Sequence, residues 1–74
     1  MEIIEGSVIK VIGFNCGDTA KFRLSSMGIR LGSIIKIKHI QPIGGPMTIK
    51  VGRSEYTIGR GLFSKIIYEK EEKE

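Results

Sequence analysis

The most constraining feature of this sequence is a pair of glycines, Gly28 and Gly32, between a helix-like pattern and a strand-like pattern. Before them, apolar residues recur with helical spacing at Ala20, Leu24 and Met27. A glycine after the last periodic apolar residue is the usual helix stop, because it adopts the left-handed conformation without a Cβ clash. A second glycine lets the chain turn sharply. The sequence therefore predicts a helix that stops at Gly28, then a short connecting segment, Ile29-Arg30-Leu31, which we call the crossing, and then the start of a strand.

The helix is expected to begin at Asp18 or Asn15, either of which can cap its first backbone N–H groups. The side chains of Lys21 and Arg23 fall away from the apolar stripe. Phe22 also lies off this stripe, about 160° around the helix from Leu24 at roughly 100° per residue, and is therefore expected to be exposed.

Most of the remaining chain is rich in β-branched residues and alternates between apolar and polar positions, which is typical of half-buried strands. One such segment sets Ile35 and Ile37 against Lys36 and Lys38. A Gly- and Pro-rich loop over 41–46 and a turn at 52–54 separate these segments, and 59–64 allows one helical turn. The segments expected to form strands are 7–13, 33–40, 47–51, 55–58 and 65–68.

Five short strands, with one short helix after the first strand, predict a mainly β fold: a small SH3-like barrel. An OB-fold fits less well, since its helix comes later in the chain. Closure into a barrel would remove the sheet edges. We expect residues 1–68 to form this single domain and residues 69–74 to form a charged, solvated tail.

The charge is unevenly distributed along the 74 residues, whose net charge is +4. Residues 1–68 carry ten basic and four acidic side chains, which suits nucleic acid, an anionic membrane surface or an acidic protein partner. The lone Cys16 cannot form an internal disulfide, and no signal peptide or apolar stretch of membrane-spanning length is apparent. We expect a cytoplasmic protein whose contact with a membrane is indirect.

No pattern in the sequence indicates catalysis. The single histidine, His39, has no visible carboxylate partner, and Cys16 is interpreted as a small turn or core residue. No phosphate-binding glycine motif is present. We expect neither an enzyme nor a cofactor. A divalent transition metal bound weakly through His39 in an oligomer is left open, because one chain does not supply a tetrahedral ligand set.

Five basic residues could form a positive face, but they are explained by the solvated side of amphipathic strands. Aromatic side chains, which single-strand binding usually requires, are not interleaved with them. No nucleic-acid partner is therefore expected. These residues are Lys36, Lys38, Lys50, Arg53 and Arg60.

The order and spacing of these motifs resemble those of the FeoA family over residues from about Gly6 to Tyr68. The helix stop, with Arg23-Leu24, Met27-Gly28-Ile29 and Gly32, fits the family signature. The family's later strands and its Gly-Gly-Pro loop fit Ile35-Lys-Ile37, Gln41 to Pro46, Ile49-Lys-Val51, Tyr56-Thr-Ile58 and Ile66-Ile-Tyr68.

The resemblance implies an SH3-like barrel and an accessory or adaptor protein of ferrous iron uptake, acting through protein–protein interaction with FeoB, a membrane transporter with a cytosolic G-protein domain. The alternative is a regulatory module that binds a transition metal or nucleic acid, since the same barrel resembles the C-terminal domain of DtxR-type repressors. The family has no agreed catalytic residues.

The candidate partner-binding residues are Lys21, Phe22 and Arg30, with Phe14 and Tyr56 in reserve. Self-association through leftover apolar surface such as Phe22 and Ile40 is also left open. The chain departs from the family pattern at Gly59, often arginine, and at Phe63, often alanine. Phe63 implies either different local packing or an exposed aromatic contact.

Overall fold

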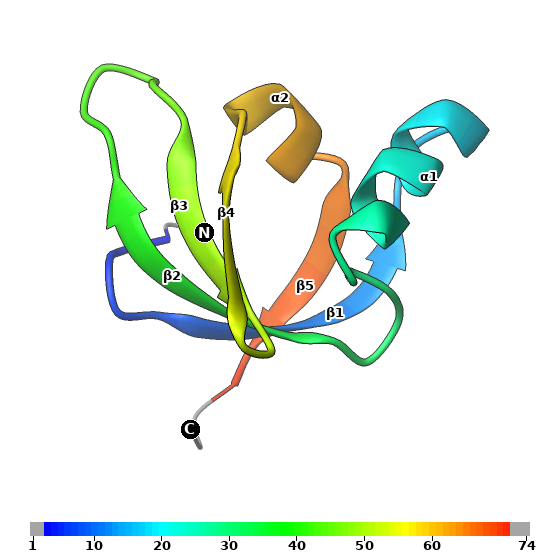
Figure 1. The fold of residues 1–74 in the computed structure, drawn as a ribbon, viewed down its shortest axis with the longest axis horizontal. Coiled ribbons are helices and arrows are strands. Elements are labelled where there is room, and N and C mark those ends of the chain that lie inside the picture. The colour runs from blue at the N-terminus through cyan, green and yellow to red at the C-terminus, as the bar shows by residue number, and fades with distance from the viewer. Residues whose placement is uncertain (1–2, 72–74) are drawn as a thin grey trace.

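A computed structural model describes residues 3–71 and shows five antiparallel strands, with a short helix after the first (Figure 1). The mainly β class and the helix position are as predicted, and the predicted strand ends are correct to within two residues. The elements are β1 (Val8–Phe14), α1 (Asp18–Ser26), β2 (Ile34–Ile40), β3 (Met47–Val51), β4 (Ser54–Ile58), α2 (Arg60–Phe63) and β5 (Ile66–Lys70).

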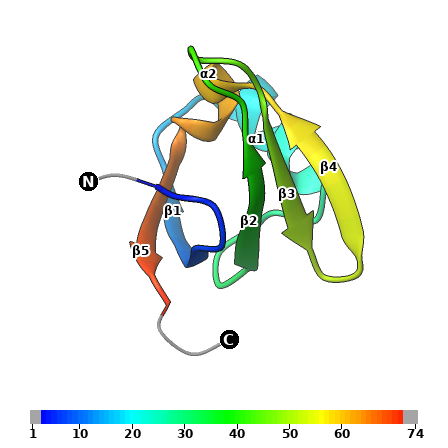
Figure 2. The ribbon, with the colours of Figure 1, turned by 90° about the vertical axis from the view of Figure 1, so that its left-hand side faces the viewer.

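The strands form one curled sheet in the order β4-β3-β2-β1-β5. Consecutive strands β2, β3 and β4 pair as hairpins, while β1 lies between β2 and β5. The expectation that closure removes both sheet edges is wrong, because β4 and β5 are not paired within residues 3–71. The connection between them contains α2, which lies across the open end of the curled sheet (Figures 1 and 2).

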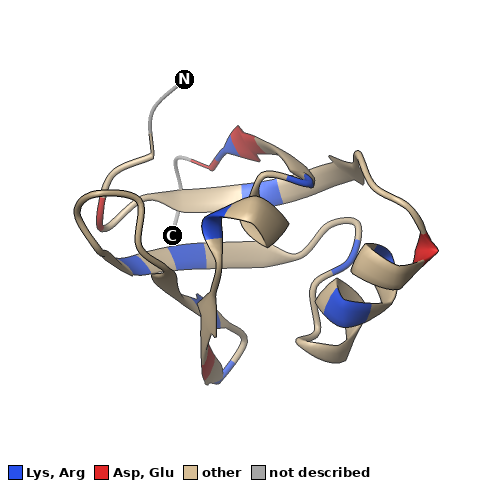
Figure 3. Ribbon diagram, turned by 90° about the horizontal axis from the view of Figure 1, so that it is seen from above, with Lys and Arg blue, Asp and Glu red and all other residues tan. Residues whose placement is uncertain are grey.

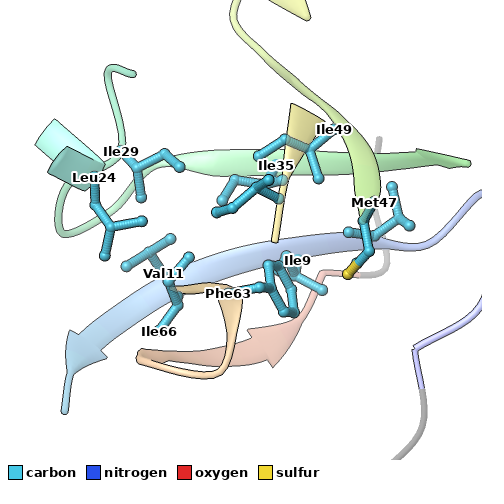
Figure 4. Packing of buried hydrophobic residues seen from close by; sticks show 11 residues of the cluster. Ile9, Val11, Leu24, Ile29, Ile35, Met47, Ile49, Phe63 and Ile66 are labelled. Carbon is cyan, nitrogen blue, oxygen red and sulfur yellow. The ribbon is translucent and has the colours of Figure 1, made fainter. Parts of the chain in front are cut away.

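The concave face of the sheet holds the core, to which every strand and both helices contribute (Figure 4). Alternation decides which side chains enter it: Ile35 and Ile37 are buried, whereas Lys36 and Lys38 are exposed. Burial of each large aliphatic side chain contributes about 1.5–3 kcal/mol to stability. The core residues are Ile9, Val11, Leu24, Ile29, Ile35, Ile37, Met47, Ile49, Ile58, Phe63 and Ile66.

Helix α1 ends at Ser26 with Met27 as its C-cap, just before the predicted glycine, and the backbone hydrogen bonds explain why. Gly28 has φ +81°, and its N–H donates to the carbonyl of Ser25 at 2.9 Å. The N–H of Ile29 donates to the carbonyl of Leu24 at 3.1 Å. These two bonds define a Schellman motif, which satisfies carbonyls that the helix leaves free. The accompanying apolar pair is Leu24 and Ile29, both almost fully buried.

The crossing after the helix is closed by Ser33. Its hydroxyl donates to the carbonyl of Gly28 at 3.1 Å and accepts from the N–H of Arg30 at 2.9 Å. Gly32 has φ +87°, and its N–H donates to the carbonyl of Val11 at 2.8 Å. The crossing is thereby joined both to the helix end and to β1.

Two boundaries differ from prediction. The helix N-cap is Gly17, not Asp18 or Asn15, and it makes no side-chain capping bond. Asp18 is instead the first helical residue, where its carboxylate interacts favourably with the positive end of the helix dipole.

The last strand ends at Lys70 and not at Tyr68, because Glu69 and Lys70 pair with β1. Of the predicted solvated tail, residues 69–70 are therefore strand, and residues 72–74 lie outside the described residues.

Replacing Gly28 by alanine should destabilise the protein by about 1–2 kcal/mol, because an L-residue is disfavoured in the left-handed conformation. A Cβ at Gly28 would meet only Val51 Cγ1 at 3.7 Å, so the expected cost comes from the backbone. Gly61→Ala is the matched control, since Gly61 lies in α2 with open space around a Cβ. Urea unfolding measures both variants, and equal midpoints would contradict this account of the helix stop.

Candidate functional site

The predicted partner-binding residues lie on α1 and on the crossing that follows it, and all are exposed. Phe22 is 73% exposed, as the helical spacing predicts. Lys21 and Arg23, the neighbours of Phe22 in the sequence of α1, are exposed as well. Figure 3 shows basic residues on α1, apart from those on the strands. We call Lys21, Phe22 and Arg30 the α1 surface.

Lys21 is positioned partly by an aromatic ring. Its Nζ lies 5.9 Å from the ring centre of Phe14, within reach of a cation–π attraction. Phe14, one of the two reserve residues, thus lies beside the α1 surface. The other, Tyr56, is half-buried on β4 and packs against the core.

Arg30 is held through its backbone, because its N–H donates to Ser33 and its carbonyl accepts from the N–H of Ser33 at 2.9 Å. The side chain is exposed. A rigid backbone with a free guanidinium suits recognition of a carboxylate, which arginine binds through two parallel hydrogen bonds.

The structure gives His39 a carboxylate partner that was not visible in the sequence. Its Nδ1 lies 3.0 Å from Oε2 of Glu5, and the same oxygen accepts the N–H of Ile40 at 2.9 Å. Both side chains are about half exposed. The pair joins the N-terminal segment to the end of β2.

Within residues 3–71, His39 and Glu5 do not belong to any group of three or more potential metal ligands. Cys16 is a half-buried free thiol that packs against the core. A complete metal-binding set is therefore not formed by one copy of the described chain.

A groove of about 670 Å³ opens beside the core between β5, α2 and the adjoining ends of β2 and β3. Two polar side chains, Arg60 and Ser64, also line it. Its apolar lining consists of Ile3, Ile40, Met47, Phe63, Ile66 and Tyr68. Its volume falls within the range of about 300–1,000 Å³ that small-molecule sites occupy.

Phe63 is buried, with 7% of its surface exposed, so the exposed aromatic contact considered from the sequence is wrong. The ring packs against the core, 5.7 Å from the ring of Tyr68 at an interplanar angle of 41°. This tilted pair contributes both to the core and to one wall of the groove.

Sequence reasoning missed the groove and the Glu5–His39 pair. Both depend on residues far apart in the chain, brought together by the N-terminal segment, which donates from the N–H of Gly6 to the carbonyl of Ile37 at 2.7 Å. The only local signal was Arg60 between two glycines, and this segment reads equally well as a turn.

Within residues 3–71, no helix is both long and apolar enough to cross a membrane. The fold and the exposed surfaces together define a small SH3-like β domain with two possible contact regions, the α1 surface and the groove.

Comparison with known proteins gives the family. The FeoA domain family matches residues 1–70. A protein of Methanocaldococcus jannaschii, provisionally named Fe(2+) transport protein A, is 45% identical over 65 residues, covering 88% of this chain and 74% of that protein. The chain therefore belongs to the FeoA family, which consists of accessory proteins and not of enzymes.

Two solved structures support the fold. A crystal structure described as iron uptake regulatory protein FeoA is 30% identical, with TM-score 0.82, covering 93% of this chain and 89% of that chain. The Stenotrophomonas maltophilia FeoA, an SH3 domain protein crystallised with zinc, is 17% identical, with TM-score 0.77 and coverage of 92% and 85%. The predicted SH3-like fold is confirmed.

The two phenylalanines with opposite exposure give a matched pair for stability. Phe63→Ala should cost about 3–5 kcal/mol, because it leaves a cavity in the core. Phe22→Ala should change stability by less than about 0.5 kcal/mol, because its ring is mostly solvated. Chemical denaturation of both variants measures the difference; a large cost at Phe22 would show that its ring is packed and not free for a partner.

Proposed function

We propose that this protein is a cytoplasmic adaptor of ferrous iron uptake that binds the cytosolic part of a FeoB-type transporter through the α1 surface. Family membership supports the link to iron uptake, as do the names of relatives as an iron transport protein and an iron uptake regulatory protein. The contact with the transporter is our inference from this surface.

The single observation that carries the proposal is the exposure of Phe22. A phenylalanine that is 73% exposed gains about 1–2 kcal/mol less from folding than a buried one, and an aromatic residue in such a position is suited to be buried by a partner. The α1 surface therefore has the composition of an interface centre: an aromatic anchor with charged groups at its rim.

The charge of this surface indicates the kind of partner. Lys21 and Arg30 are both exposed, and neither forms an ion pair within residues 3–71. A partner with carboxylates opposite them would be attracted over a distance and oriented on contact, with an association rate that falls as salt is added.

Co-purification with detergent-solubilised FeoB of the same organism tests the contact. We expect retention of the wild type at low salt, weaker retention at high salt, and loss of about tenfold or more in affinity for the combined Lys21→Glu and Phe22→Ala variant. Arg53→Glu, an exposed charge reversal on the β3–β4 turn, is the matched control and should be retained. Equal retention of both variants would rule out the α1 surface.

A regulatory module that binds metal or nucleic acid is the second candidate, and the Glu5–His39 pair is the observation that favours it. Glu5 and His39 are two potential metal ligands per chain, so two copies together would supply the four ligands that a tetrahedral site requires. The zinc of the Stenotrophomonas protein makes this ion a reasonable probe.

This second candidate predicts zinc-dependent dimerisation that is lost in His39→Ala and weakened in Glu5→Gln. Sedimentation velocity with and without zinc measures it. Steeply salt-dependent binding to nucleic acid in a mobility-shift assay would support the same candidate. A monomer in both conditions, without a nucleic-acid shift, would eliminate it and leave the adaptor.

A further inference from the structure

The groove beside α2 lies at the part of the fold where strand pairing is incomplete. Its walls come from β5 on one side and from the ends of β2 and β3 on the other. Figure 2 shows β5 and β2 apart at this level, with the N-terminal segment crossing between them. The groove therefore lies at the open end of the curled sheet and reaches the core, since the core residues Met47, Phe63 and Ile66 line it.

Within residues 3–71, Arg60 is the one charged residue in the groove lining. Its Nη2 donates to the carbonyl of Gln41 at 3.2 Å, which aligns the guanidinium and leaves its remaining N–H donors for other groups. Within residues 3–71 no carboxylate lies close enough to form an ion pair with it. A cation at the edge of an apolar groove complements a ligand that carries an apolar group and a carboxylate together.

The pairing of β5, which contributes Ile66 and Tyr68 to the groove, narrows the choice of ligand. In residues 3–71, β5 is hydrogen-bonded to β1 alone, so its second edge presents unpaired backbone N–H and C=O groups. An extended peptide can pair with such an edge, whereas a lipid chain offers nothing for these groups. The aromatic wall of Phe63 and Tyr68 suits a bulky apolar side chain.

We propose that the groove binds an extended peptide segment of another protein, with a bulky apolar residue in the groove and an acidic residue at Arg60. The segment adds a strand beside β5 and covers apolar surface that the open sheet leaves accessible. This site is distinct from the α1 surface, and it does not depend on which protein supplies the segment.

The experiment is an NMR titration of the ¹⁵N-labelled full chain with an acetylated and amidated pentapeptide, Val-Phe-Thr-Asp-Val, whose phenylalanine and aspartate lie on the same face of an extended strand. We expect saturable shifts centred on the backbone amides of Ile40, Arg60 and Tyr68. The peptide with asparagine in place of aspartate should bind about three- to tenfold more weakly, because the charge-assisted bond to Arg60 is lost. The Arg60→Gln variant should bind the aspartate peptide more weakly than the wild type by the same factor.

Arg53→Gln is the matched control, since it removes an exposed arginine remote from the groove lining, and it should bind the peptide as the wild type does. The combined Lys21→Glu and Phe22→Ala variant should also bind it normally. The peptide titration tests the groove and the co-purification tests the FeoB contact, so either proposal can be rejected without the other.

Three results would overturn the proposal. Equal affinity for the aspartate and asparagine peptides would show that Arg60 does not recognise the acidic side chain. Shifts centred on other residues, or no saturable shifts, would remove the groove as a peptide site. Tighter binding of octanoate than of the peptide, with shifts at the same residues, would make it a site for a small amphipathic acid instead.

Discussion

The contact between Leu24 and Ile29 is the interaction on which the rest of this structure depends. It spans the left-handed Gly28, so the two residues enter the core from opposite sides of the helix stop. The same turn fixes the crossing, which Ser33 then attaches to the helix end. Because the apolar side of α1 is held in this way, Phe22 and the basic residues must face solvent. The candidate partner surface is thus a consequence of how the helix is anchored.

The second determinant is that the sheet curls without closing. The β4–β5 connection contains the single turn of α2, and Phe63 fills the adjoining core, where it meets Tyr68. A small domain has few apolar residues to bury, so leaving a groove beside them costs stability that a fully closed barrel would retain. Part of the groove lining consists of core residues whose positions are fixed by packing, which favours ligand binding without a large ordering cost.

Contacts between charged side chains contribute little to the stability of this fold. The one acid–base contact that the structure shows within residues 3–71 joins Glu5 to His39 at the surface, where such contacts contribute about 0–1 kcal/mol. The excess of basic side chains in residues 1–68 therefore lies largely outside internal ion pairs. It acts on association instead, by attracting acidic partners toward the α1 surface and toward Arg60.

The sequence alone determined the strands, the helix stop and the exposure of Phe22, because periodicity and glycine conformation depend on neighbours within a few residues. Only the tertiary structure decided the Glu5–His39 pair, the groove at Arg60 and the burial of Phe63. Each of these requires the register of distant segments, such as the N-terminal segment beside β2. That register is set by packing of the whole core, which no local pattern encodes.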